Sequence, residues 1–218
     1  MSDKPAVLGF LEARILGVLM EKEKTTPDAY PLTLNSLTAG CNQKSSRDPV
    51  IDVSDSEVQA ALEELRGHTL IIETYGASGR VLRYAHNFAR VYALPQPAAA
   101  LLAILVLRGA QTVSELRANC ERLYRFDDSS SVEAFLDELA ARSSGALTAR
   151  LPKQAGSREH RWVHLLCGEA PVTEASDRSD EKAATYRELE ARVARLERQV
   201  AELQAGLAAY CDDATTLQ

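Results

Sequence analysis

The sequence of 218 residues has little cysteine and no cysteine pairing motif. Its four cysteines, Cys41, Cys120, Cys167 and Cys211, lie far apart and form no C-x-x-C pair. This scatter fits reduced, isolated thiols better than a disulfide framework. We expect the four thiols to act as small buried apolar groups in a reducing compartment.

The sequence also lacks a long apolar run. A membrane-spanning helix needs about 20 predominantly apolar residues, and the longest run, between Pro97 and Arg108, is shorter. The first ten residues, MSDKPAVLGF, have no basic segment followed by an apolar stretch and a small-residue cleavage site, so they do not resemble a signal peptide. These absences predict a cytoplasmic protein with no membrane segment.

Sequence motifs of catalysis are absent as well. The chain has no P-loop, no G-x-G-x-x-G and no G-x-S-x-G. His160, His164 and Cys167 are spaced like metal ligands, but they fall on one expected strand and no fourth ligand is evident. Zinc sites usually take their ligands from two elements. We therefore expect no enzyme activity, no metal, no cofactor and no small-molecule substrate.

Positive charge is scarce in the second part of the chain. The net charge is −6, with −2 over residues 1–170 and −4 over residues 171–218. The chain has no basic tail. An acidic protein of this kind is a poor candidate for non-specific binding to nucleic acid.

What the first part of the chain does contain is a helical pattern followed by a hairpin. Apolar spacing predicts helices over 9–22, 33–42 and 54–66. The third helix opens with a capping box, Ser54-Asp-Ser-Glu57. The segments TLIIETY and RVLRYAH are rich in β-branched and aromatic residues and flank a glycine-bearing turn, which predicts a β-hairpin.

The same order then recurs. A short stiff linker at 95–97 precedes a helix over 98–108. Capping boxes at 112–115 and 130–133 open two further helices, and a hairpin over about 146–166 closes the unit. Three helices followed by a hairpin is the order of a winged-helix domain.

The two copies align residue by residue. Segment 57–65 matches 131–139, and segment 34–41 matches 113–120, so that Cys41 falls on Cys120. The matched apolar positions are Val58, Leu62 and Leu65 in the first copy and Val132, Leu136 and Leu139 in the second. This agreement predicts an internal duplication. The expected fold class is mainly α with small β-hairpin wings, an α+β protein.

A heptad pattern ends the chain. Apolar residues alternate at spacings of three and four: Tyr186, Leu189, Val193, Leu196, Val200, Leu203, Leu207 and Tyr210. Valine at the a positions with leucine at d favours a parallel two-stranded coiled coil. The alternative is a helix that docks on the winged helices of its own chain. Both leave this seam as the candidate interface.

The expected domain organisation follows from these patterns. It comprises a first winged-helix domain over 1–94, a linker over 95–97, a second winged-helix domain over 98–169, a polar linker over 170–181, a coiled-coil helix over 182–211 and a frayed tail over 212–218.

Residues 11–50 closely resemble the opening of the YceH-like family of uncharacterised bacterial proteins, and the stretches EKEKTTPD and CNQKSSRDPV are specific to it. Segments 78–86, 112–126 and 162–169 resemble its later parts, so the resemblance covers about residues 8–170. Ser46 stands where asparagine is frequent in that family. The resemblance implies a tandem winged-helix fold in a bacterial cytoplasmic protein, and it points to no particular reaction, cofactor or catalytic residue.

The charge on the predicted third helices bears on function. A winged helix that reads DNA places this helix in the major groove, where phosphates favour Lys and Arg. Here residues 54–66 have a net charge of −3 and residues 131–142 a net charge of −2. The sequence therefore favours a non-enzymatic protein-interaction or regulatory module. The alternative is a DNA-binding transcriptional regulator that contacts the duplex through basic wings.

Polar residues of one loop and of both wings are the candidate contacts with a partner or a phosphate. They are Asn42, Gln43, Lys44 and Arg47 in the loop, Arg80 and Arg83 in the first wing, and Arg150, Lys153, Arg158 and Arg161 in the second. The alternative for the loop is a set of hydrogen-bonded turns that holds the second and third helices at their crossing angle. For the wings, the alternatives are solvated tips or pairing with the acidic helices of the same chain.

Overall fold

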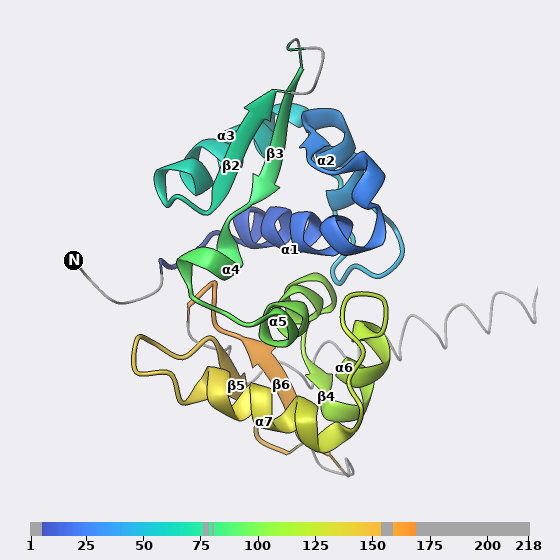
Figure 1. The fold of residues 1–218 in the computed structure, drawn as a ribbon, viewed down its shortest axis with the longest axis vertical. Coiled ribbons are helices and arrows are strands. Elements are labelled where there is room, and N and C mark those ends of the chain that lie inside the picture. Colours follow the sequence, from blue (N-terminus) through green and yellow to red (C-terminus); the bar gives the residue numbers. More distant parts are fainter. Residues whose placement is uncertain (1–5, 76–78, 80, 154–158, 169–218) are drawn as a thin grey trace, which may run out of the picture. The chain divides into compact units, whose positions relative to one another are not determined.

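A computed structural model of the chain describes residues 6–75, 79, 81–153 and 159–168 (Figure 1). The described residues 6–168 belong to one compact unit. The predicted linker, coiled-coil helix and heptad seam after residue 169 lie outside the described residues.

Residues 6–94, here called the N-module, contain helices followed by a hairpin. The elements are α1 (Phe10–Thr25), the 3-10 helix η1 (Pro27–Ala29), β1 (Leu32–Thr33), α2 (Leu34–Cys41), α3 (Asp55–Gly67), β2 (Ile71–Tyr75), β3 (Leu82–His86) and α4 (Phe88–Val91). The three strands form an antiparallel sheet in the order β1-β3-β2. The hairpin is thus widened by one short strand that precedes α2.

Residues 95–168, here called the C-module, repeat this order. The elements are α5 (Gln96–Arg108), β4 (Gln111–Thr112), α6 (Val113–Cys120), α7 (Ser129–Ala140), β5 (Thr148–Arg150) and β6 (Arg161–His164). Their sheet has the order β4-β6-β5 and is also antiparallel. The prediction of an α+β protein with small antiparallel hairpins is confirmed.

The modules correspond at the level of single residues. Thr33 and Thr112 each cap the helix that follows, through a side-chain oxygen that accepts from a backbone N–H three residues on. Cys41 and Cys120, at the ends of these helices, are both fully buried. The apolar positions matched in sequence, Val58, Leu62, Leu65, Val132, Leu136 and Leu139, are all buried. The residue alignment made from sequence therefore predicts the core correctly.

Some details differ from the sequence predictions. Helix α7 begins at Ser129 with Asp128 as its N-cap, whose carboxylate accepts from the Ser131 N–H at 2.7 Å. The predicted capping box from Ser130 is therefore wrong, because an aspartate two residues earlier provides the acceptor. Gln96 and Pro97 form the first turn of α5 rather than an extended linker. Proline suits this position, since an N–H there would have no helical partner.

Helices α1 and α5 lie next to each other in the middle of this unit (Figure 1). Every residue of α5 from Pro97 to Leu107 is buried, which explains why the longest apolar run of the sequence lies here. Gly17 allows the helices to approach closely, because a Cβ atom at this position would lie 3.0 Å from Leu107 Cδ2 and 3.0 Å from Val106 Cγ1.

Polar bonds add to this contact between the modules. The Asp48 N–H donates to the Leu107 carbonyl at 2.8 Å, and the Leu8 N–H donates to the Leu166 carbonyl at 2.8 Å. The Arg108 guanidinium donates to Ser46 Oγ at 2.8 Å. Residues 6–168 therefore form a joined pair of modules rather than two independent domains.

Replacement of Gly17 by valine tests this helix contact. We expect Gly17→Val to lower the free energy of unfolding by about 1–3 kcal/mol, because overpacking of a closely fitted core costs this much. The gain in helix propensity, a few tenths of a kcal/mol, is smaller. Urea unfolding measures the change.

The matched control is Gly67→Val. Gly67 is also helical, and a Cβ atom there meets nothing within 4 Å. Its unfolding free energy should stay within about 0.5 kcal/mol of the wild type. Equal effects of the two substitutions would mean that the close approach at Gly17 does not matter.

Candidate functional site

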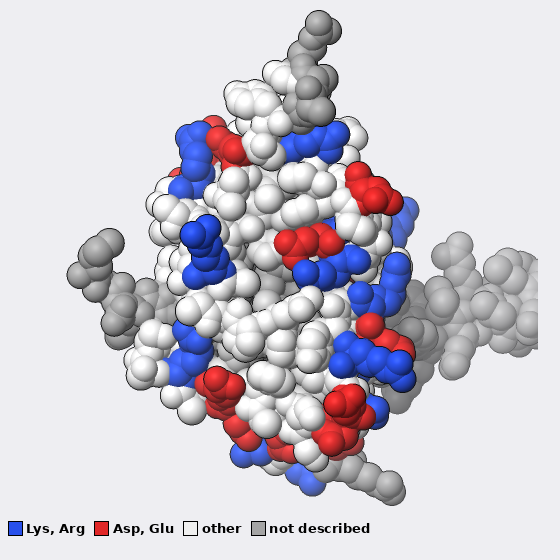
Figure 2. Space-filling view, viewed as in Figure 1, with Lys and Arg blue, Asp and Glu red and all other residues white. Residues whose placement is uncertain are grey.

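The third helix of each module exposes acidic side chains. Helix α3 starts with the predicted Ser54–Glu57 capping box and buries one apolar stripe. Its exposed acidic residues are Asp55, Glu57, Glu63 and Glu64, and those of α7 are Glu133, Asp137 and Glu138. Figure 2 shows one face of the molecule, where basic and acidic side chains are interspersed around uncharged surface. Among the residues that the structure describes, this face shows no continuous basic area.

Two wing arginines, Arg83 and Arg161, are bound within their own modules. They occupy equivalent places, because Arg83 lies opposite Thr33 and Arg161 lies opposite Thr112 in the sheets. Arg83 donates to the Pro31 carbonyl at 2.7 Å, and Arg161 donates to the Ala110 carbonyl at 2.7 Å. Each arginine thus ties the middle strand to the segment before the second helix.

Arg161 also pairs with a carboxylate on the second helix of its module. Its guanidinium lies 3.2 Å from Glu115 Oε1, a residue of α6. Arg150 lies 3.7 Å from Glu133 Oε1 of α7 and 5.7 Å from the ring centroid of Trp162. Lys153 is exposed, and the predicted contacts Arg80 and Arg158 lie outside the described residues. Contact of these wings with a partner stays a prediction.

The loop over residues 42–48 is bonded to the framework around it. The Asn42 amide donates to the Val53 carbonyl at 2.8 Å and accepts from the Val53 N–H at 2.9 Å. Gln43 accepts from Lys22 Nζ at 3.3 Å and donates to the Ser45 carbonyl at 3.0 Å. Lys44 is exposed. The two amides therefore hold turns in place, which is the bracing arrangement considered from sequence.

Arg47 is buried and bound to a carboxylate on α1. Its guanidinium donates to Glu21 Oε2 at 2.7 Å and to Glu21 Oε1 at 3.2 Å, and its Nε donates to the Gly40 carbonyl at 3.1 Å. Burial alone raises the pKa of Glu21, but the hydrogen bond and the charge of Arg47 outweigh it and hold this pKa below its ordinary value. Arg47 thus attaches the loop over residues 42–48 to Glu21 of α1 and to Gly40 of α2.

A second arginine, Arg14, lies under the same loop and is fully buried. It donates to the Pro49 carbonyl at 2.8 Å and to the Cys41 carbonyl at 3.4 Å. Burial lowers the pKa of Arg14, and the charge of Arg47 lowers it further. Sequence reasoning missed this residue, although an arginine within the apolar pattern of α1 is a visible signal.

Ser46 has a backbone φ of 60°, in the left-handed region. Asparagine adopts this conformation more readily than most residues, so the asparagine frequent in the YceH-like family suits the site. The Ser46 hydroxyl accepts from Arg108 of the C-module. The loop therefore contributes to the contact between the modules.

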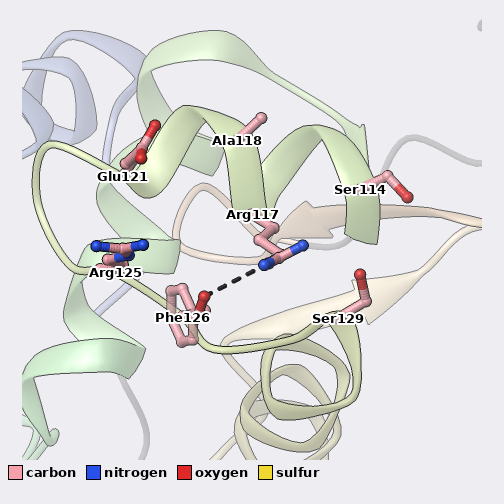
Figure 3. Close-up of a pocket in the computed structure, with 7 residues that line it drawn as sticks. All are labelled: Ser114, Arg117, Ala118, Glu121, Arg125, Phe126 and Ser129. Carbon is pink, nitrogen blue, oxygen red and sulfur yellow. Dashed lines mark hydrogen bonds between the residues drawn. The ribbon is translucent and has the colours of Figure 1, made fainter.

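The C-module has an open pocket of about 330 Å³ between α6 and the start of α7 (Figure 3). Its lining residues are Ser114, Arg117, Ala118, Glu121, Arg125, Phe126 and Ser129. Arg117 donates to the carbonyls of Phe126 at 3.4 Å and of Asp127 at 2.8 Å. The pocket thus combines two guanidinium groups with one carboxylate, and one of these guanidinium groups is held by backbone.

Another pocket of about 330 Å³ is lined by residues of both modules, including His86, Glu23 and the apolar residues Met20, Ala99 and Leu123. His86 Nε2 lies 3.5 Å from Glu23 Oε2. Burial lowers the pKa of His86, and the nearby Glu23 carboxylate offsets this only in part. Sequence reasoning could not find this pocket, because its walls are far apart along the chain.

The residues with metal-like spacing in the sequence have different surroundings. His160 is exposed, whereas burial lowers the pKa of His164 to about 4. Among the residues that the structure describes, no three His, Cys, Asp or Glu side chains are placed to hold a metal ion. In the same part of the chain, no helix is long and apolar enough to cross a membrane.

The cysteines divide into two classes. Burial raises the pKa of Cys41 and that of Cys120 to about 12. The expectation of buried thiols is confirmed for these two and is wrong for Cys167, which is exposed after the end of β6. Cys211 lies outside the described residues.

Comparison with known proteins identifies the family. The profile of the family described as "Protein of unknown function, DUF480" matches residues 8–157. The chain belongs to this family. The family suspected from the sequence is thus confirmed.

Similar proteins from several bacteria carry the name "UPF0502 protein". One from Dechloromonas aromatica (strain RCB) is 51% identical over 208 residues, which cover 94% of this chain and 96% of that protein. One from Acidovorax sp. (strain JS42) is 53% identical over 207 residues, covering 92% and 91%. One from Burkholderia orbicola (strain MC0-3) is 58% identical over 164 residues, covering 75% and 68%.

The buried pair of Arg47 and Glu21 can be tested by substitution. We expect Arg47→Met to lower the free energy of unfolding by about 3–5 kcal/mol, because it leaves the Glu21 carboxylate buried without its partner. The double variant Arg47→Met/Glu21→Gln should recover part of this loss. Urea unfolding at neutral pH measures both.

Arg66→Met is the control for this pair. Arg66 lies 3.7 Å from Glu73 Oε2, and its side chain is 60% exposed. An exposed pair contributes at most about 1 kcal/mol. If Arg47→Met costs no more than Arg66→Met, the loop is not fastened by the buried pair.

Proposed function

We propose that the two modules are winged-helix domains in tandem and that they form a non-enzymatic protein-interaction module in the bacterial cytoplasm. The support for the domain type is the repeated order of three helices and a hairpin, with a short third strand before the second helix. The proposed domain boundary lies near residue 95, before α5.

The observation that carries the proposed function is the charge of the third helices. Together, α3 and α7 expose seven acidic side chains, while α3 contains one basic residue, Arg66, and α7 contains none. DNA phosphates would meet like charge on these helices. A protein surface with basic groups fits them better, because complementary charge aids association.

The arginines of the wings also favour a protein partner over DNA. Arg83, Arg150 and Arg161 would contact DNA phosphates in the alternative function, but each already has a partner in its own module. Release of these contacts would offset part of any gain from a phosphate. Contact between the modules through α1 and α5 holds the two acidic helices in one arrangement, which suits a fixed platform for a partner protein.

DNA binding is the direct test of this proposal. In fluorescence anisotropy with a random 30-base-pair duplex, we expect no dissociation constant tighter than about 10 µM at about 150 mM salt. Glu63→Lys/Glu64→Lys should strengthen DNA binding at least several-fold, because it replaces two negative charges on α3 by positive ones.

The opposite outcome is equally specific. Binding in the micromolar range or tighter, with a steep salt dependence and loss in Arg80→Glu/Arg83→Glu, would favour the DNA-binding regulator over the interaction module. Arg66→Glu serves as a basic-to-acidic control on the third helix.

We also propose that residues 182–211 form a coiled coil that dimerises the protein, on the strength of the heptad seam in the sequence. Light scattering should give the molar mass of a dimer for the full chain. Val193→Asp/Val200→Asp places charges at two a positions and should give a monomer. The control Ala194→Asp/Ala201→Asp changes adjacent positions off the seam and should leave the dimer intact.

A monomeric wild-type chain would refute the coiled-coil dimer. A dimer that persists in Val193→Asp/Val200→Asp would show that another surface joins the two chains.

A further inference from the structure

The edge of the N-module sheet is open at strand β2. In the order β1-β3-β2, this strand pairs with β3 along one side over all five of its residues, from Ile71 to Tyr75. No other strand in the part of the chain that the structure describes pairs with its second side. An open edge presents backbone N–H and C=O groups that a further strand can bind.

The register shows which groups face outward. The Asn87 N–H donates to the Leu70 carbonyl at 2.8 Å, so this opposed pair is a hydrogen-bonded one. Hydrogen-bonded and non-bonded pairs alternate in an antiparallel ladder. The backbone groups of Ile72 and Thr74 therefore bond to β3, and those of Glu73 and Tyr75 point to the open edge.

The backbone of His86 supports this assignment. His86 lies opposite Ile71, in a pair that should not be hydrogen bonded. Its N–H donates to the Tyr30 hydroxyl at 2.8 Å, on the side of the strand away from β2.

The same hairpin exposes apolar side chains. Ile72 is 47% exposed, Tyr75 67% and Val81 48%. The other large apolar side chains with comparable exposure in the described residues are Val7, Phe10, Val50 and Val91. Single exposed apolar residues are ordinary. Three on one short hairpin beside an unpaired edge provide the side-chain contacts that an added strand requires.

The charge around β2 indicates which kind of strand could bind at its open edge. Glu73 in β2 is exposed, and the exposed acidic residues Glu63 and Glu64 lie on α3, which packs against β2. Arg66 of α3 lies 3.7 Å from Glu73 and offsets one of these three charges, so the group stays net negative. A second copy of the chain would bring the same acidic groups against this edge. A basic segment would instead find complementary charge.

The equivalent edge in the C-module is different. Strand β5 has only three residues and ends in Arg150, which is partly exposed and contacts Glu133 of α7. Of the two sheets in the described residues, that of the N-module therefore has the open edge suited to a basic strand.

We propose that β2 binds an extended segment of a partner protein, in which apolar and basic residues alternate, as a fourth strand of the sheet. This mode of recognition uses backbone bonds for affinity and alternate side chains for specificity. The proposal rests on the interaction function proposed above and specifies its partner. The outward groups of Glu73 and Tyr75 bind the added backbone, while the exposed side chain of Ile72 in β2 contacts its apolar side chains.

Capped synthetic octapeptides titrated into the full isotope-labelled chain provide the test. We expect the lysine–valine peptide KVKVKVKV to bind with a dissociation constant of about 10–500 µM, since one added strand makes an interface below the standard size. The glutamate–valine peptide EVEVEVEV should bind at least tenfold more weakly. Amide hydrogen exchange should slow at Glu73 and Tyr75 on addition of the lysine–valine peptide.

Two variants of Glu73 distinguish the contribution of its backbone N–H to binding from that of its side-chain charge. Glu73→Pro removes an outward N–H without removing a bond to β3, and it should weaken binding of the lysine–valine peptide at least tenfold. Glu73→Gln keeps the N–H and should weaken binding only a few-fold. Thermal unfolding of each variant checks the fold, and the exchange measurement on the wild type remains decisive if Glu73→Pro does not fold.

The proposal is wrong if neither peptide binds, if protection appears away from β2, or if a folded Glu73→Pro protein binds as tightly as the wild type. Equal affinity for both peptides would show that the partner segment does not need basic residues, and this part of the proposal would be wrong. The DNA experiment separates this failure from failure of the wider function. If the peptides fail to bind and DNA does not bind either, the protein-interaction function stands but uses another surface. Tight DNA binding through Arg80 and Arg83 would instead refute the protein-interaction function.

Discussion

The contact between α1 and α5 is the constraint on which the described structure depends. Gly17 has no side chain to separate the helices, and the last turn of α5 packs directly onto α1. The loop over residues 42–48 reinforces this contact through Ser46 and Asp48. Because α1 and α5 are each the first helix of a module, their contact leaves the third helices and the hairpins available at the surface.

The modules share a scaffold and differ at the surface. Arg83 and Arg161 make the same bond to the segment before the second helix, at 2.7 Å in both cases. By contrast, the edge strand has five residues in the N-module and three in the C-module. Their exposed acidic residues also differ, with four on α3 and three on α7. Similar frameworks therefore carry unlike surfaces.

Sequence predicted the elements that bury a periodic apolar stripe and missed those that do not. The helices and the matched core positions follow from spacing, because burial of a stripe imposes it. Strands β1 and β4, with two residues each, are too short to show a period. For the candidate site, residue type identified Asn42 and Arg47 as special but could not show whether they face solvent. That distinction depends on Glu21 and Val53, which are distant in sequence.

The paired thiols have a practical consequence. Cys41 and Cys120 lie at equivalent points, one in each module, and are closed to solvent and protonated well above neutral pH. A thiol reagent can attack them only after the surrounding helices separate, because the reactive thiolate requires both access and deprotonation. The rate at which Cys41 or Cys120 is alkylated therefore reports how often its own module opens locally. Unequal rates would show which of the two modules opens more readily.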